Sequence, residues 1–180
     1  MAKERESGAD VTRDTVQLFG WIPGRATADP RHRCTCIGGK ARTYKFLSNP
    51  QKAWVHACQD WAKKQVASEL RDGPHAGDVV IHLRFLMERP AKHYTGNNRA
   101  RPLKDRSVDL PYLKKPDFDN LAKAATDAWN GILWVDDSQV VEALIQKRYV
   151  AADEQPGLQV DIWMGTDRQM TFVPCIDSMR

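Results

Sequence analysis

The spacing of hydrophobic residues changes several times along this chain, and each spacing predicts a particular element. Short apolar runs, and runs in which apolar and polar residues alternate, are typical of strands because successive strand side chains point to opposite faces. Such runs predict strands at residues 16–19, 79–87, 141–149 and 158–164. Gly38-Gly39 separates two further short runs, near 33–37 and 41–46, and predicts a hairpin.

One long segment repeats its apolar residues at helical spacing. Ser48 or Asn49 can cap this helix, Pro50 suits its first position, and Gly73-Pro74 stops it. Its apolar stripe contains Trp54, Ala57, Cys58, Trp61, Ala62, Val66 and Leu70. We expect the tryptophans of this stripe in the core rather than stacked on nucleic-acid bases.

A second helix is expected from Asp117 or Asp119 to Trp129, where Asn130-Gly131 ends it. Together these elements predict a single α/β (α+β) domain with one mixed or antiparallel sheet and two main helices. The domain is expected to cover residues 15–165. Residues 1–14 and 166–180 are expected to be tails, the first of them solvated and mobile.

Residues 88–115 follow neither period and predict a long loop, which in a compact domain is often functional. Eight Lys and Arg against three Asp and Glu give this loop a net charge of +5, while the whole chain has +4. The loop is either simply solvated or an arm that contacts DNA phosphates, with Tyr94 and Tyr112 available to stack on bases. Its position before an acidic cluster favours the second interpretation, with these contacts: Arg99, Arg101, Lys104, Arg106, Lys114 and Lys115.

Composition narrows the class of protein further. Hydrophobic residues make up 42% of the 180 residues, enough for a core. The N-terminus lacks the apolar stretch of a secretory signal, and no run approaches the roughly 18 apolar residues that span a bilayer, so we expect a cytoplasmic protein with no membrane partner. The four Cys residues do not show the usual paired spacing of zinc sites, so we expect ordinary reduced thiols.

The candidate chemistry lies in two groups of acids. Asp117 and Asp119 stand at the start of the second helix, and Asp136-Asp137 precede the next strand. Capping explains either of the first two acids alone, but it does not explain both of them together with a second acidic pair. Mg²⁺ prefers a few carboxylate ligands and retains several waters, so Asp117, Asp119 and Asp137, with Asp136 as a further candidate, could form an open Mg²⁺ site.

Lys123 lies one helical turn after Asp119. It could form an ordinary surface ion pair, worth about 0.3–0.5 kcal/mol, or it could hold a phosphate beside the metal. Asn120 and Gln139 could contact DNA or a metal-bound water, and capping or surface roles are equally possible for them.

These motifs resemble those of the RusA family of Holliday junction resolvases. The resemblance rests on Asp117-Phe-Asp-Asn-Leu-Ala-Lys123 and on Asp136-Asp-Ser-Gln-Val140, and it is strongest over residues 115–149. It implies a homodimer that uses Asp residues and Mg²⁺, with Mn²⁺ as a substitute, to nick four-way or branched DNA in recombination and repair. In that family the essential acids correspond to Asp117, Asp119 and Asp137, and the helical lysine to Lys123. Many relatives occur in phages and prophages.

Three other functions remain open from the sequence. A less selective nuclease of the same fold would cut flaps or forks, and a junction-binding protein would not cut at all. A nucleotide phosphohydrolase is less well supported because the chain has no G-x-x-x-x-G-K-[ST] loop.

Overall fold

The computed structural model describes residues 15–29, 33–44, 47–70, 73–104 and 110–165. Four strands, β1 (Val16–Pro23), β4 (Val79–Met87), β5 (Val140–Tyr149) and β6 (Gly157–Met164), form one sheet in the order β1-β6-β4-β5. β6 is antiparallel to both of its neighbours, whereas β4 and β5 are parallel. The sheet is therefore mixed, as the sequence predicts, and β1 and β5 form its edges.

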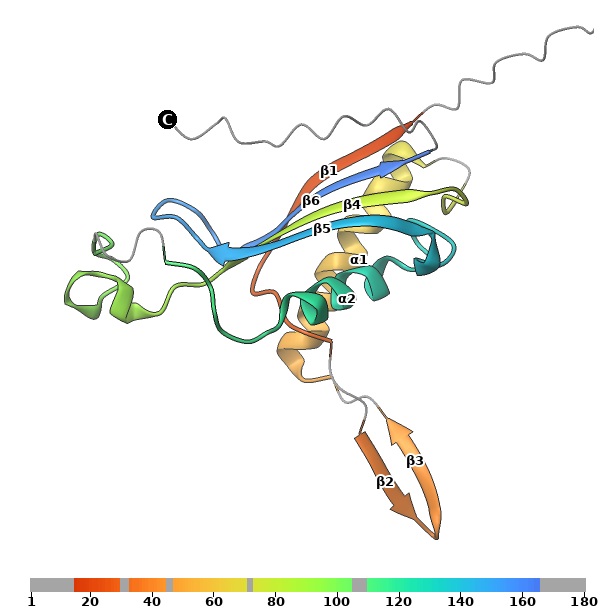
Figure 1. The fold of residues 1–180 in the computed structure, drawn as a ribbon, viewed down its shortest axis with the longest axis horizontal. Helices are drawn as coiled ribbons and strands as arrows, with labels where there is room; N and C mark the ends of the chain where they lie inside the picture. The colour runs from red at the N-terminus through yellow and green to blue at the C-terminus, as the bar shows by residue number, and fades with distance from the viewer. Residues whose placement is uncertain (1–14, 30–32, 45–46, 71–72, 105–109, 166–180) are drawn as a thin grey trace, which may run out of the picture.

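Helices α1 (Asn49–Glu69) and α2 (Phe118–Trp129) cover one face of this sheet (Figure 1). Side chains on that face alternate with exposed or half-buried ones, so Leu158, Val160, Ile162 and Met164 of β6 are buried. The two helices meet through Trp61 and Trp129, whose ring centroids are 5.5 Å apart. Trp54 and Trp61 are only 2% and 8% exposed, which confirms that the tryptophan stripe of α1 belongs to the core.

β1 is longer than the sequence predicts, because Gly20 does not end it. A Cβ atom at Gly20 would lie 2.2 Å from Nε1 of Trp61, so the glycine lets the Trp61 indole pack directly against the strand. The apolar run ends at Phe19, but the backbone continues to pair with β6 as far as Pro23. Gly20, which in the sequence suggests the end of a strand, instead allows Trp61 to pack closely against it.

The remaining strands, β2 (Arg33–Ile37) and β3 (Lys40–Tyr44), form the expected hairpin around Gly38-Gly39. They make a separate two-stranded sheet that projects away from the body (Figure 1). The chain that leads into the hairpin is fixed to both helices. The Asp29 N–H donates to the Asn120 carbonyl of α2 at 3.1 Å, and Gln51 Nε2 of α1 donates to the Ala28 carbonyl at 3.1 Å.

Other expectations are only partly covered by the structure. The two tails, residues 1–14 and 166–180, lie outside the described residues. Cys36 is exposed, and burial raises the pKa of the Cys58 thiol to about 12. In the part of the chain that the structure describes, no helix is long and apolar enough to cross a bilayer.

Gly20→Ala should destabilise the protein, because Trp61 must move to admit the new methyl group. We expect the free energy of unfolding to fall by about 1–3 kcal/mol, the usual cost of overpacking a core. Urea denaturation of the variant and of the wild-type protein measures the difference. Gln17→Ala, at an exposed position of the same strand, is the control and should change stability little. Equal stability of the two variants would show that Trp61 adapts without cost.

Candidate active site

Asp117 and Asp119 occupy the start of α2, where the helix dipole favours negative charge. Asp117 is the N-cap residue, yet its side chain makes no capping hydrogen bond; its backbone carbonyl accepts from the Leu121 N–H at 3.1 Å. Among the described residues, Oδ1 of Asp119 accepts only a long hydrogen bond, 3.4 Å, from Asn120 Nδ2. Both side chains are exposed, so capping does not use them and their oxygens remain available to a ligand.

The second acidic pair divides into one structural and one free residue. Asp136 caps a short 3-10 helix, η4 (Asp137–Gln139): its Oδ1 accepts from the Ser138 N–H at 2.9 Å. The hydrogen bonds from Ser138 lower the pKa of Asp136. Asp137 is exposed, and its side chain has no hydrogen bond or ion pair within the described residues. Of the two acids, Asp137 is the one whose carboxylate oxygens are available to bind a ligand.

Gln139 completes the cap and anchors it. Its Oε1 accepts from the Asp136 N–H at 2.9 Å, and its Nε2 donates to the carbonyls of His75 and Gly77 at 3.0 and 2.7 Å. The side chain thus fixes η4 against the segment that precedes β4. Of the roles that the sequence left open for Gln139, the structure shows the capping one.

The structure brings Asp117 and Asp119 together but leaves Asp137 at the other end of α2. Lys147, near the end of β5, contacts the Pro116 carbonyl just before α2, whereas Asp137 begins η4, which directly precedes β5. α2 and β5 therefore run in opposite directions, and the 12 residues of α2 span about 18 Å. Among the described residues, no group of three His, Cys, Asp or Glu side chains could hold one metal ion.

Lys123 pairs forward along α2 rather than backward. Its Nζ lies 3.3 Å from Oδ1 of Asp127, one turn further on, and not beside Asp119. The pair is solvent-exposed and contributes at most about 0.5 kcal/mol to stability. Lys123 still lies on the same helix as the two acids, so its ammonium group can turn toward a bound anion at little cost.

A clamp that the sequence did not reveal holds the chain directly before Asp117. Lys147 Nζ donates to the carbonyls of Lys114 and Pro116 at 3.0 and 2.9 Å, and the Tyr112 hydroxyl donates to the Lys115 carbonyl at 2.8 Å. The signal was present in the pattern of β5. Lys147 pairs with Phe85 of β4, so it is a charged residue on the face that the helices cover.

The basic loop has a buried root. Arg89, only 3% exposed, donates from Nε to the Val150 carbonyl at 2.5 Å and lies 5.3 Å from the centre of the Tyr149 ring. His93 packs against the same ring. Burial lowers the pKa of the His93 imidazole, and the positive charges of neighbouring residues lower it further. Tyr112 also contacts Tyr149, with ring centroids 4.9 Å apart, so its ring is part of this packing.

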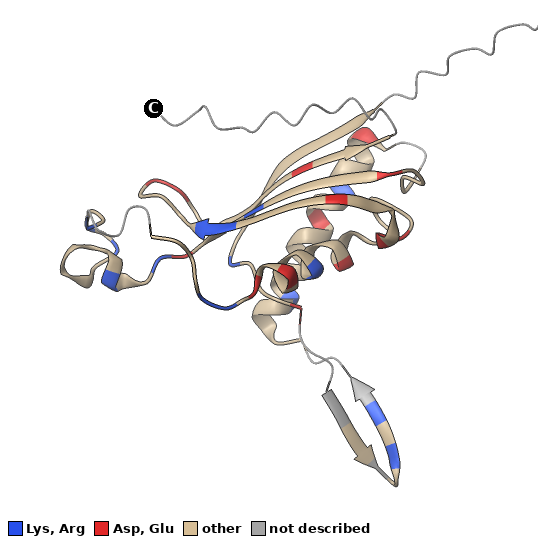
Figure 2. Ribbon diagram, viewed as in Figure 1, with Lys and Arg blue, Asp and Glu red and all other residues tan. Residues whose placement is uncertain are grey.

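The predicted DNA-binding cations differ in how freely they can bind phosphate. Arg99 forms an ion pair with Glu88, and Lys104 Nζ donates to the Lys92 carbonyl at 2.9 Å. Arg101, Lys114 and Lys115 are exposed and have no acidic partner within the described ranges. Arg106 lies outside the described residues. Figure 2 shows the basic segment running directly into the acids at the start of α2.

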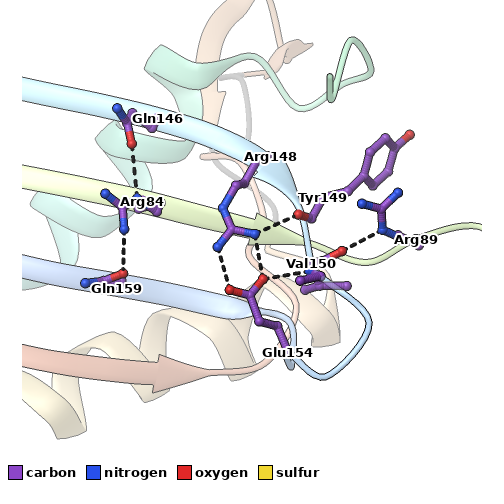
Figure 3. A network of polar contacts seen from close by, with 9 residues as sticks. Arg84, Arg89, Gln146, Arg148, Tyr149, Val150, Glu154 and Gln159 are labelled. Carbon is purple, nitrogen blue, oxygen red and sulfur yellow. Dashed lines mark hydrogen bonds and ion pairs between the residues drawn. The ribbon is translucent and has the colours of Figure 1, made fainter. Parts of the chain in front are cut away.

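The end of β5 beside this root is fixed by an ion pair. Arg148 donates from two nitrogens to the two carboxylate oxygens of Glu154, at 2.5 Å each, and the Ala151 N–H donates to the same carboxylate at 2.7 Å (Figure 3). The Arg148 hydrogen bonds hold the pKa of Glu154 below its usual value. This contribution to stability is therefore present above about pH 4.5 and is lost as Glu154 becomes protonated.

Lys147→Met should loosen the segment that carries Asp117. The change keeps most of the side-chain volume but leaves the Lys114 and Pro116 carbonyls without their donor. We expect a loss of about 1 kcal/mol, or a fall in Tm of about 2–4 °C. Lys123→Met, which removes only an exposed ion pair, is the control for thermal denaturation. A fall in Tm no larger than that of the control would mean that the clamp adds nothing to stability.

Similarity to known proteins extends over most of this chain. The family described as endodeoxyribonuclease RusA matches residues 23–163, a range that contains all four strands of the main sheet in whole or in part, both helices and the acids. The uncharacterized protein YqaN of Bacillus subtilis (strain 168) is 33% identical over 90 residues, 50% of this chain and 57% of that protein. The chain thus aligns with little more than half the length of this relative. Its sequence, from the end of β1 to the end of β6, places the chain in the RusA endodeoxyribonuclease family.

Proposed function

We propose that this protein is a divalent-metal-dependent endonuclease that resolves Holliday junctions and related branched DNA by paired symmetric nicks, in recombination and repair. The observation that carries the proposal is the exposed Asp117/Asp119 pair, unused by the helix cap. Exposed Lys114 and Lys115, which have no acidic partner within the described residues, lie just before Pro116 and this pair. Cations bind the DNA backbone, while carboxylates of this kind suit a hard metal ion.

The carboxylates that one chain brings together would form only part of a metal site. Asp117 and Asp119 would hold Mg²⁺, or Mn²⁺ in its place, through their carboxylates. A divalent ion at such a site supplies charge stabilisation and an activated water for phosphodiester hydrolysis. The third proposed ligand, Asp137, belongs to the opposite end of α2, so one chain alone does not complete the set.

A homodimer would supply the missing ligand. β5 is an edge strand and runs opposite to α2. A two-fold axis beside β5 would therefore bring the Asp137 end of one copy to the Asp117 end of the other. Exposed apolar residues flank both ends: Phe118 is 55% exposed beside the first pair of acids, and Val135 and Val141 are 60% and 65% exposed beside Asp137. These patches would cover one another in the same dimer.

Lys123 and the basic loop would act on the DNA rather than on the metal. Exposed Arg101, Lys114 and Lys115 would hold the backbone on either side of the cut. Lys123 would exchange its weak contact with Asp127 for the phosphate and neutralise charge that develops there. Asp136 stays in its capping role.

Two other functions compete with this one. A nuclease of the same fold that cuts flaps or forks would use the same acids, and a non-cleaving protein would use the same cations. Incubation of the protein with labelled junction, flap and linear duplex, with Mg²⁺, Mn²⁺ or EDTA, separates them. Preference for the junction supports the proposal, equal cutting of flaps supports the first rival, and binding without cutting supports the second.

Asp117→Asn, Asp119→Asn and Asp137→Asn should each abolish cutting while leaving junction binding intact or tighter, because each change removes a ligand and a charge that repels phosphate. Asp136→Asn should keep most of the activity, since Asn also caps a helix. Cleavage rates and Kd values on one junction measure both effects. Near-normal cutting by any two of the first three variants would overturn the assignment.

Mixing two inactive proteins tests whether the acids are shared between copies. In a mixed dimer of Asp119→Asn and Asp137→Asn chains, one shared site would contain all three acids. After subunit exchange, about one quarter of the wild-type nicking should return, because half of the dimers are mixed and each has one working site. Asp117→Asn mixed with Asp119→Asn is the control and should stay inactive, because in the mixed dimer each of these changes disables a different site. If no activity returns although light scattering shows mixed dimers, the acids of each chain act by themselves.

A further inference from the structure

The β2–β3 hairpin has a charge that the proposed function does not yet use. Residues 30–46 contain five Lys and Arg and no Asp or Glu. Subtracting these five from the 27 Lys and Arg of the chain leaves 22, against 23 Asp and Glu. The net positive charge of the protein therefore depends on this segment, and an accumulation of this kind favours a polyanionic partner.

The register of the hairpin sorts its residues onto two faces. Lys40 and Arg42 are two residues apart on β3, so they share a face, and Arg42 lies opposite Thr35. Ala41 and Cys36 are paired on the other face. Both cations are exposed and have no acidic partner in the described part of the chain. Figure 2 shows Lys and Arg positions (blue) along β3.

Strand pairing with the body does not account for the hairpin within the described residues. The hairpin shares no strand pairing with the main sheet, and an isolated two-stranded hairpin is at best marginally stable in water. An element that projects from the body and carries unpaired cations on one face is better suited to a partner than to the core. A two-stranded ribbon also has dimensions that fit the major groove of a duplex.

The position of the hairpin identifies which part of the DNA it would meet. The chain that enters the hairpin is fixed at Asp29, whose N–H donates to the carbonyl of Asn120. Asn120 directly follows Asp119. Arg33 is the fourth residue after Asp29, so the hairpin begins within about 14 Å of the start of α2. Five further residues of strand add roughly 16 Å.

We propose that the β2–β3 hairpin is a second DNA contact, which binds the duplex arm that flanks the cut and places Lys40 and Arg42 on its phosphates. This inference rests on the proposed function. At 3.4 Å per base pair, the reach of the hairpin corresponds to phosphates about four to nine base pairs from the Asp117/Asp119 site. The basic loop of residues 88–115 and the hairpin would then grip the DNA at two separate places.

The test uses Asp119→Asn protein, so that cleavage does not disturb the binding measurement. In this background, Lys40→Gln/Arg42→Gln should weaken binding to a four-way junction and flatten the plot of log K against log[salt] by up to about 1.8, or about 0.9 for each lost contact. Lys63→Gln/Lys64→Gln, two exposed cations of α1, is matched in charge and should leave the slope unchanged. Arg101→Gln in the basic loop is the positive control.

Hydroxyl-radical footprinting then locates the contact. Protection of the deoxyriboses about four to nine base pairs from the cut should be lost in the hairpin variant and kept in the α1 variant. An unchanged slope and footprint would overturn the proposal. So would weaker binding that accompanies loss of the dimer in light scattering, because the hairpin would then contact a second copy. If wild-type protein binds through the hairpin but does not cut, the nuclease proposal fails and the contact stands.

Discussion

The parallel pairing of β4 with β5 is the constraint on which the rest of this structure depends. Two parallel neighbours require the chain between them to return along the whole sheet, and α2 makes most of this return. The helix start therefore lies beside the end of β5, and the helix end lies beside its beginning. Acids that are close in sequence are in this way separated in space, and the clamp of Lys147 on the Pro116 carbonyl fixes the separation.

The packing of the helices determines what else reaches this end of the molecule. Trp61 fits against β1 only because residue 20 is a glycine, and its contact with Trp129 ties α1 to α2. With both helices fixed, Gln51 and Asn120 hold the chain that leads to the hairpin, and Arg89 and Tyr149 hold the root of the basic loop. The hairpin and the basic loop thus both begin at the same end of α2, from segments that contacts with the body hold in place.

Much of this fold could be predicted from the sequence because its signals are local. The apolar period of α1, the alternation in β6 and the turn at Gly38-Gly39 each identified an element, and the bounds of β4 were correct. Long-range geometry was less accessible. Nothing local to Gly20 reveals that an indole 41 residues later occupies the space of its missing side chain. Likewise, the motifs identified the acids as a set, but the direction of β5 relative to α2 determines whether one chain can gather them.

Gln139 and Asp136 illustrate a further point about the motif that contains them. The four residues from Asp136 to Gln139 combine a helix cap, made by Asp136, with an exposed acid, Asp137. The two positions tolerate different substitutions. Any short side chain with an acceptor, such as Asn, Ser or Thr, can replace the first acid and preserve the cap. Asp137 has no such freedom in its proposed role. Under the proposed assignment, a search that weights both acids equally would reject active relatives that vary at the cap and accept inactive ones that have lost the ligand.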